Sequence, residues 1–325
     1  MMSKFDYIRP KSIDEALSIL APGDAVVHAG GTDLLGCLRE HIFEVKTLVS
    51  LGNLRELKGI QKTREGGLWI GALTTITEVA EDPRVREMFP GLAGAAFEVG
   101  SPQLRNQGTL GGNLCQKPRC WYYRGDFHCL RKGGDTCFAV GGENRFHCIF
   151  GGDSCYIVHP SDTAPILSAL DATVHIEGPR GGRDIPVGEF HVPPGRDPQR
   201  ETVLEQGELI TGIFLPPPPA GLRSSYRKVR ARQSWDFALA GVALALVQDA
   251  GKVAGAKVVL SGVAPVPWRL TEVENLLAGR KLDWETLRLA AETAVKGAGP
   301  MEQNAYKLPL VKALIEEELT AISTG

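Results

Sequence analysis

Six of the seven cysteines lie between Cys115 and Cys155, and only Cys37 lies outside this stretch. Convergent thiolates can bind an iron–sulfur cluster or zinc, and under oxidising conditions they form disulfides. The six cysteines are separated by four, eight, seven, ten and six residues, whereas structural zinc sites usually carry C-x2-C pairs. A chain of 325 residues with 43% hydrophobic side chains needs no disulfide framework to form a core. The pattern favours a cluster, with zinc and disulfides as alternatives.

Two glycine-rich turns could hold a phosphate group. Gly30-Gly31-Thr32-Asp33 follows a short apolar segment and precedes a segment with helical spacing, and Gly108–Asn113 follows a polar run that begins at Ser101. Glycines allow the backbone to approach a pyrophosphate, and the amides at a helix start donate hydrogen bonds to it. The first turn is therefore typical of a nucleotide site, with an ordinary tight turn as the alternative. In the second, glycine indicates close backbone approach or positive φ.

The elements that must position these residues mix helix and strand. Apolar positions at helical spacing predict helices over residues 12–20, 34–40, 77–81, 91–99, 270–277, 284–295 and 310–319. Short apolar or alternating segments predict strands over residues 25–29, 47–51, 68–71, 173–192, 209–215, 241–247 and 253–260. Pro216–Pro219 remove four amide donors and predict a domain boundary. The cysteine-rich stretch has no sustained period, which predicts a long ordered loop held by a metal centre.

Composition excludes several classes of protein. The 36 basic and 38 acidic residues nearly cancel, so no electrostatic footprint for a nucleic acid or an anionic membrane is present. No stretch approaches 18 uninterrupted apolar residues, and the opening residues MMSKFDYIRP lack the order of a secretory signal. We expect a cytoplasmic protein, although such a chain can also be exported with a partner subunit.

Four motifs in order along nearly the whole chain resemble the FAD-binding medium subunit of the molybdenum hydroxylase (xanthine dehydrogenase) family. They are Ala29–Leu34, Thr109–Asn113, His159–Asp162, and Tyr226–Arg230 continuing to Asp236-Phe237. More narrowly, the chain is similar to the branch whose FAD subunit carries an extra [4Fe-4S] cluster, such as the β subunit of 4-hydroxybenzoyl-CoA reductase and the FAD subunits of some aldehyde dehydrogenases.

This resemblance implies an α+β fold in two domains. Residues 1–218 would form an FAD-binding domain of the vanillyl-alcohol oxidase (PCMH) type, with subdomains over about 1–57 and 58–218. The cysteine-rich cluster loop, residues 115–155, would belong to the second subdomain. Residues 219–325 would form a small α+β domain like the C-terminal domain of the CO dehydrogenase flavoprotein.

The resemblance also implies which residues hold FAD. The two turns would bind the pyrophosphate and neighbouring groups through backbone amides, Asp162 would accept a hydrogen bond from FAD, such as one from the ribose, and Lys228 would lie near the isoalloxazine. A cation there would stabilise the anionic reduced flavin and raise its potential. The alternatives are that Asp162 is an ordinary turn residue and that Lys228 is a solvated lysine on a strand. The complete expected set is Ala29, Gly30, Gly31, Thr32, Asp33, Leu34, Leu35, Gly36, Ser101, Thr109, Leu110, Gly111, Gly112, Asn113, Asp162 and Lys228.

For the cluster, the resemblance implies four thiolate ligands: Cys120, Cys129, Cys137 and Cys155. We expect Cys115 and Cys148 to be small buried side chains, and His128 and His147 to be surface or hydrogen-bonding residues. The first gap between these cysteines is shorter, and the last gap longer, than in 4-hydroxybenzoyl-CoA reductase. The resemblance therefore does not imply that the protein is this reductase.

The function implied is electron transfer by one subunit of a larger oxidoreductase. FAD would connect the two-electron chemistry of an external acceptor or donor with the one-electron steps of iron–sulfur centres, and no catalytic residue is expected in this chain. The partners would be a small subunit with two [2Fe-2S] clusters and a large subunit with the molybdopterin cofactor, as a heterotrimer or a dimer of heterotrimers. A self-sufficient flavin oxidase or dehydrogenase and a non-enzymatic metal-stabilised binding module are the alternatives.

Overall fold

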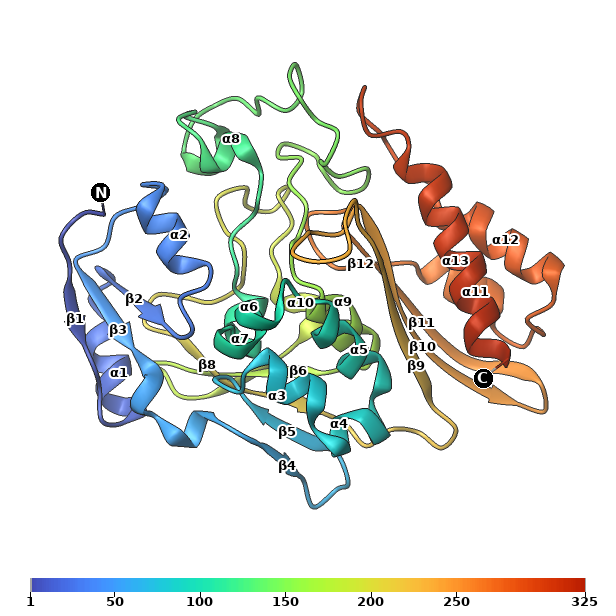
Figure 1. Ribbon diagram of the computed structural model, residues 1–325, viewed down its shortest axis with the longest axis horizontal. Coiled ribbons are helices and arrows are strands. Elements are labelled where there is room, and N and C mark those ends of the chain that lie inside the picture. The colour runs from blue at the N-terminus through green and yellow to red at the C-terminus, as the bar shows by residue number, and fades with distance from the viewer. Residues whose placement is uncertain (1, 325) are drawn as a thin grey trace.

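The computed structural model describes residues 2–324, which contain three β-sheets with helices packed against them (Figure 1). The first sheet is parallel, in the order β1 (Asp6–Ile8), β3 (Thr47–Ser50) and β2 (Ala25–His28). Helix α1 (Ile13–Leu20) begins at Ser12, whose hydroxyl accepts a hydrogen bond from the Glu15 amide at 3.2 Å. Ala16 and Leu20 of α1 pack with Val49 and Leu51 to form the core of this sheet.

The second sheet has five antiparallel strands and carries most of the central core. Its order is β4 (Ile60–Lys62), β5 (Leu68–Gly71), β8 (Leu209–Leu215), β6 (Thr173–Glu177) and β7 (Arg183–Pro186). The helices of this region are α3 (Ile76–Glu81), α4 (Pro83–Met88), α5 (Pro90–Glu98), α6 (Pro102–Gln107), α7 (Leu110–Leu114), α9 (Thr163–Ala169) and α10 (Val187–Phe190). The apolar residues of these strands and helices share one hydrophobic cluster.

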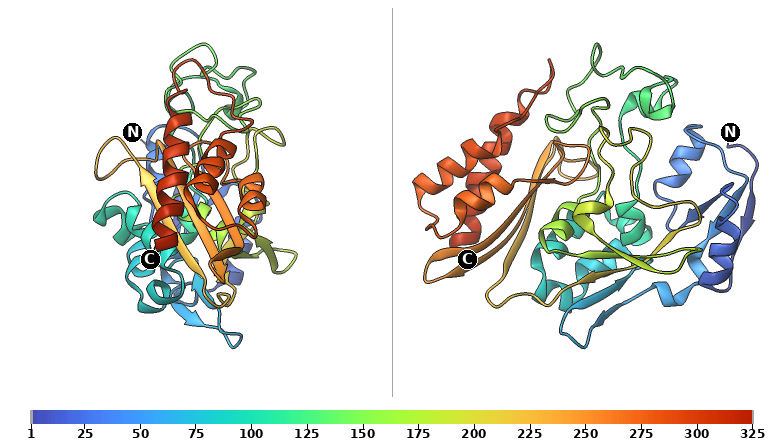
Figure 2. Two further views of the ribbon diagram at one scale, coloured as in Figure 1. Left: turned by 90° about the vertical axis from the view of Figure 1, so that its right-hand side faces the viewer. Right: turned by 180° about the vertical axis from the view of Figure 1, so that it is seen from behind.

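The third sheet is antiparallel and is covered on both faces (Figure 2). Its order is β12 (Trp268–Arg269), β11 (Lys252–Ser261), β10 (Ala240–Asp249) and β9 (Arg223–Val229). Side chains alternate along β10, so Ala243 and Ala245 join the central core while Val242 and Leu244 face the C-terminal helices. These helices are α11 (Thr271–Leu277), α12 (Trp284–Ala294) and α13 (Lys307–Thr324).

The cysteine-rich segment has little regular structure and lies at the top of Figure 1, above the three sheets. Within it, helix α8 (Trp121–Arg124) is followed by a single 3₁₀ turn, Leu130–Lys132. The C-terminal region holds the far end of the segment: the Asn304 side chain donates to the carbonyls of His147 and Cys148, both at 3.1 Å. The near end of the cysteine-rich segment lies beside α2 (Leu34–Arg39), because the Arg124 side chain donates to the carboxylate of Glu40, the residue that follows this helix. None of the described helices combines the length and apolarity that crossing a bilayer requires.

Candidate functional site

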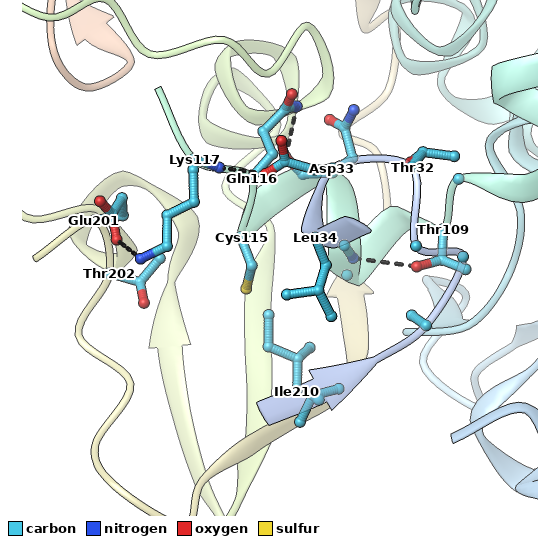
Figure 3. A pocket seen from close by; sticks show the side chains of 18 of the residues that line it. Thr32, Asp33, Leu34, Thr109, Cys115, Gln116, Lys117, Glu201, Thr202 and Ile210 are labelled. Atoms are coloured by element: carbon cyan, nitrogen blue, oxygen red, sulfur yellow. Dashed lines mark hydrogen bonds and ion pairs between the residues drawn. The ribbon is translucent and has the colours of Figure 1, made fainter. Parts of the chain in front are cut away.

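Both glycine turns line one cavity of about 600 Å³ (Figure 3). This volume lies within the range of small-molecule and cofactor pockets. The residues expected to contact FAD that line the cavity are Ala29, Gly30, Gly31, Thr32, Asp33, Leu34, Thr109, Gly111, Gly112, Asn113, Asp162 and Lys228. The structure therefore brings together residues that are up to 199 positions apart in the sequence, from Ala29 to Lys228.

The remaining residues of the expected set lie outside the lining of this cavity. Leu110 is fully buried in the central core, and the Ser101 hydroxyl caps α6 by accepting from the Leu104 amide at 3.4 Å. Leu35 and Gly36 lie in the first turn of α2, one step beyond the glycine turn. Leu110 and Ser101 thus have structural roles that their types and spacing did not reveal.

The first turn leaves backbone donors free. Gly31 has φ of 71°, a left-handed conformation that glycine adopts without strain. A Cβ on Gly30 would lie 1.8 Å from the carbonyl oxygen of Gln107, so glycine lets this turn lie directly against the segment before the second turn. The amides of Gly31, Thr32 and Asp33 have no acceptor within residues 2–324. They are donors available to an anionic ligand in the cavity.

The second turn is itself the start of helix α7, and most of its amides are already used. The amides of Leu110–Asn113 donate to the carbonyl oxygens of Thr74, Ala72 and Thr109 and to the Thr109 hydroxyl. Asn113 accepts through Oδ1 from Ser161 at 2.5 Å and Thr163 at 2.7 Å, which joins this turn to the His159–Asp162 motif. The free donors are therefore concentrated in the first turn.

Asp162 and Lys228 form a buried ion pair at the cavity wall. Lys228 Nζ donates to Asp162 Oδ2 at 2.8 Å, and the Tyr226 hydroxyl donates to Oδ1 at 2.8 Å. Burial raises the pKa of Asp162, an effect that Lys228 and Tyr226 oppose. The pair joins β9 to the residue before α9. A cation and an anion therefore lie side by side at the cavity wall, where the lysine could contact a flavin and the aspartate its ribose.

Asp33, at the end of the first turn, binds the cysteine-rich segment. Its carboxylate accepts from the Lys117 amide at 2.7 Å, from Arg124 at 2.8 Å and from Arg119. Burial acts to raise the pKa of this carboxyl, but the two guanidinium groups hold it below its ordinary value. Asp33 is therefore ionised at neutral pH and anchors Arg119, the residue before Cys120.

The four cysteines expected to bind a cluster converge on a second, much smaller cavity. Cys120, Cys129, Cys137 and Cys155 all line this space of about 10 Å³. Aromatic, polar and aliphatic side chains complete its wall: Tyr122, Tyr123, Phe138, Tyr156, Arg131, His147, Leu130 and Ile157. Burial raises the pKa of Cys120 to about 11, so the thiol is protonated unless a metal binds.

The arrangement of these thiols differs from that of a single-ion site. Within residues 2–324 no three His, Cys, Asp or Glu side chains come together as ligands of one metal ion. All seven cysteines carry free thiols, so the disulfide alternative is wrong for this structure. Thiols gathered around a shared space suit a cluster, in which each thiolate binds a different iron atom. These four thiols are the type of donor that a cluster would use, and the surrounding segment would have to widen to admit one.

Cys115 and Cys148 lie apart from the cysteine cavity. Cys115 lines the larger cavity (Figure 3), and burial raises its pKa to about 12. Cys148 is 1% exposed beside Gly152, outside the lining of the smaller cavity. His147 is buried, and its Nε2 lies 3.3 Å from Cys120 Sγ, which makes it a hydrogen-bonding residue.

Two further buried histidines lie in contact. The rings of His159 and His191 are 4.1 Å apart between centroids, and His191 Nε2 donates to the Leu114 carbonyl at 3.1 Å. Burial lowers the pKa of His191 to about 4 and that of His159 well below its ordinary value. Both rings are therefore neutral at physiological pH.

Several residues at the larger cavity were not predicted to have a role there. Lys117, Glu201, Trp235 and Phe237 line it, and the Arg119 guanidinium lies 5.1 Å from the centre of the Phe237 ring. A sequence signal exists for Lys117, Arg119 and Phe237: they lie inside or next to the recognised motifs, so the motifs could have identified them as residues of the site. Glu201 lies in an irregular segment far from every motif, and no sequence signal identifies it.

Comparisons with known proteins agree with this geometry. Residues 3–218 match the family described as the FAD binding domain in molybdopterin dehydrogenase, and residues 224–321 match the CO dehydrogenase flavoprotein C-terminal domain. The chain is 38% identical to the aldehyde oxidoreductase FAD-binding subunit PaoB of Escherichia coli K12, over 98% of each chain. It is 27% identical to the carbon monoxide dehydrogenase medium chain of Hydrogenophaga pseudoflava, over 98% of this chain and 96% of that one.

Solved structures give the same result. The Cu,Mo-CO dehydrogenase matches with a TM-score of 0.80 and 25% identity, covering 100% of this chain and 99% of that chain. Quinoline 2-oxidoreductase from Pseudomonas putida 86 matches with a TM-score of 0.78 and 25% identity, covering 100% of this chain and 99% of that chain.

The fold and the glycine-lined cavity define an FAD-binding flavoprotein of the oxidoreductase class. The chain belongs to the FAD-binding medium subunits of the molybdenum hydroxylases, the xanthine and CO dehydrogenase family. The expected family, the α+β fold and the role as an FAD subunit are thus confirmed.

Proposed function

We propose that this chain passes electrons between iron–sulfur centres and an external acceptor or donor, within a heteromeric molybdenum dehydrogenase. The observation that carries the proposal is the pair of neighbouring cavities: one lined by two glycine turns and one lined by four thiols. Bound FAD supplies the exchange between two-electron and one-electron chemistry. The partners would be a small subunit with two [2Fe-2S] clusters and a large molybdopterin subunit, in a cytoplasmic complex.

The flavin would lie with its pyrophosphate against the first turn. The free amides of Gly31, Thr32 and Asp33 support this placement, since no acceptor within the described chain competes for them. Asn113 and Thr109 would bind the neighbouring groups. Lys228 would lie at the isoalloxazine and Asp162 at the ribose, and the ion pair between them would fix the positions of both side chains. Ala29, Gly30, Leu34, Gly111 and Gly112 would shape the surrounding wall.

The thiols of Cys120, Cys129, Cys137 and Cys155 would hold a [4Fe-4S] cluster. Support comes from their convergence on one space, from the aromatic side chains around it and from the burial of Cys129 and Cys155. Aromatic and apolar neighbours exclude water and help set the potential of such a cluster. The segment has little regular structure, and it would have to widen to admit the cluster.

We further propose that residues 1–218 form the FAD-binding domain, with subdomains over about 1–57 and 58–218 and the cluster loop 115–155 in the second. Residues 219–325 would form the C-terminal domain. The separate core of the first sheet and the family matches that end at 218 and resume at 224 support these boundaries.

The test is to purify the chain anaerobically with its native partner subunits and measure flavin, iron and acid-labile sulfide. We expect both cofactors, and bleaching of the flavin by a substrate of the complex. Cys129→Ser should lose the [4Fe-4S] signal and retain FAD. Cys148→Ser, which changes a buried thiol outside the cysteine cavity, should retain both. Unchanged iron in Cys129→Ser would contradict the cluster assignment, and steady turnover of an organic donor by the isolated chain would contradict the electron-transfer role.

A further inference from the structure

The carboxylate of Glu201 contacts one cation from each of the two cavities. Its Oε1 accepts from Arg131 Nη1 at 2.8 Å, and its Oε2 accepts from Lys117 Nζ (Figure 3). Lys117 lines the larger cavity and Arg131 lines the cysteine cavity. The three side chains therefore form a continuous series of ion pairs from one site to the other.

Arg131 is placed to act on a sulfur atom. Its side chain is 1% exposed, and its buried Nε has no hydrogen-bond partner among the described residues. Arg131 and Cys155 line the same cavity. A buried cation close to a cluster thiolate stabilises the reduced, more negative state and raises the reduction potential.

Glu201 is itself held rigidly. Its side chain is 13% exposed, the Val192 amide donates to its carbonyl at 3.0 Å, and the next residue, Thr202, forms a β-bridge with His191. Charges in such a poorly hydrated environment are weakly screened, so a change in one member of the series alters the field at both ends.

We propose that Glu201 is a positioning residue that holds Arg131 at the cysteine cavity and Lys117 at the larger cavity, and thereby couples the reduction potentials of the two sites. This inference rests on the proposed function, because it requires FAD in one cavity and a cluster in the other. Glu201 partly neutralises both cations, so it lowers both potentials relative to a neutral residue at the same position.

The experiment uses the complex purified with its native partners and a redox titration, with the cluster followed by electron paramagnetic resonance and the flavin by absorbance. Glu201→Gln should retain iron and FAD, and it should raise the reduction potentials of both sites. For the cluster we expect a tenfold change in the reduction equilibrium, which corresponds to about 59 mV for one electron. The matched control is Glu274→Gln, which changes a buried carboxylate paired with Arg269 at 2.7 Å in the C-terminal core. Both potentials should stay at their wild-type values in this control.

A second variant covers the case in which Glu201→Gln fails to assemble. Lys117, whose side chain is 31% exposed, can be changed to Gln with little effect on folding. Lys117→Gln should lower the flavin potential, and it should lower the cluster potential as well because Glu201 then neutralises Arg131 alone. Iron-replete variants whose cluster potential does not move would overturn the coupling. A wild-type complex without iron would instead contradict the proposed cluster, and the coupling with it.

Discussion

Lys228 Nζ lies 2.8 Å from Asp162 Oδ2, and the two side chains are only 1% and 7% exposed. The lysine comes from β9 and the aspartate from the residue before α9, so the pair joins two elements that are 66 positions apart. Both residues also line the larger cavity, the proposed FAD site. The stability of the fold and the proposed recognition of FAD therefore share this contact.

Lys228→Met should destabilise the protein by about 3–5 kcal/mol, because it leaves the Asp162 carboxylate buried without its cation. It should also reduce the FAD content. Lys257→Met is the control, since its pair with Asp171 is much more exposed, at 31% and 64%. We expect a change within about 1 kcal/mol there. Chemical denaturation and flavin content measure both effects, and equal destabilisation by the two variants would contradict the prediction.

Gly30→Ala should disrupt the contact between the two glycine turns. The added Cβ would lie 1.8 Å from the Gln107 carbonyl oxygen, so the backbone has to move, at a cost of about 1–3 kcal/mol or more. We expect reduced FAD affinity as well. Gly94→Ala, in the middle of α5 with open space around its Cβ position, should instead be neutral or stabilising. Thermal unfolding and flavin titration compare the two variants, and normal FAD affinity in Gly30→Ala would refute the argument.

Asp33→Asn should loosen the cysteine-rich segment from the first turn. The variant removes the charge that holds Arg119 and Arg124, so faster amide hydrogen exchange is expected over residues 117–124. Asp24→Asn, which affects an exposed pair with Lys46, should leave exchange in that segment unchanged. Identical exchange in wild type and Asp33→Asn would show that the segment is held by other contacts.

Acid should destabilise the protein through His191. Burial lowers its folded-state pKa to about 4, whereas the unfolded value is about 6.5. The unfolded chain therefore binds more protons between these pH values, so stability falls as the pH is lowered through this window, by about 3 kcal/mol for the full shift. Unfolding free energies of wild type and His191→Gln at pH 7 and pH 5 test this. The variant should lose less stability on acidification, and an equal loss in both proteins would exclude His191 as the source.

The sequence was most informative where a pattern is local. Helices α1 and α12 have apolar residues at helical spacing, and strands β10 and β11 flank a polar turn, so these elements were predicted within a few residues. In the structure the two glycine turns of the motifs line one cavity and the four expected thiols line another. Spacing alone, however, did not reveal that Gly108–Asn113 leads into a helix, because the two glycines of α7 obscure its helical pattern.

Long-range contacts could not be predicted in the same way. Asp33 was expected at the cofactor, and its binding to Arg119 and Arg124 arises only when residues about 90 positions apart meet. The bridging role of Glu201 depends on a loop whose sequence contains no periodicity. Strand β9 was also missed as an element, since its exposed polar residues hide the alternation that a half-buried strand would show.

The third sheet has a practical consequence for work on fragments of this chain. Ala243, Ala245 and Val259 belong to the central core although they lie beyond residue 219. A C-terminal fragment produced alone would present this apolar face to water and would tend to aggregate. The N-terminal fragment would lose the sheet face that covers its own central core. The two halves should therefore unfold in one cooperative transition, although they match two separate families.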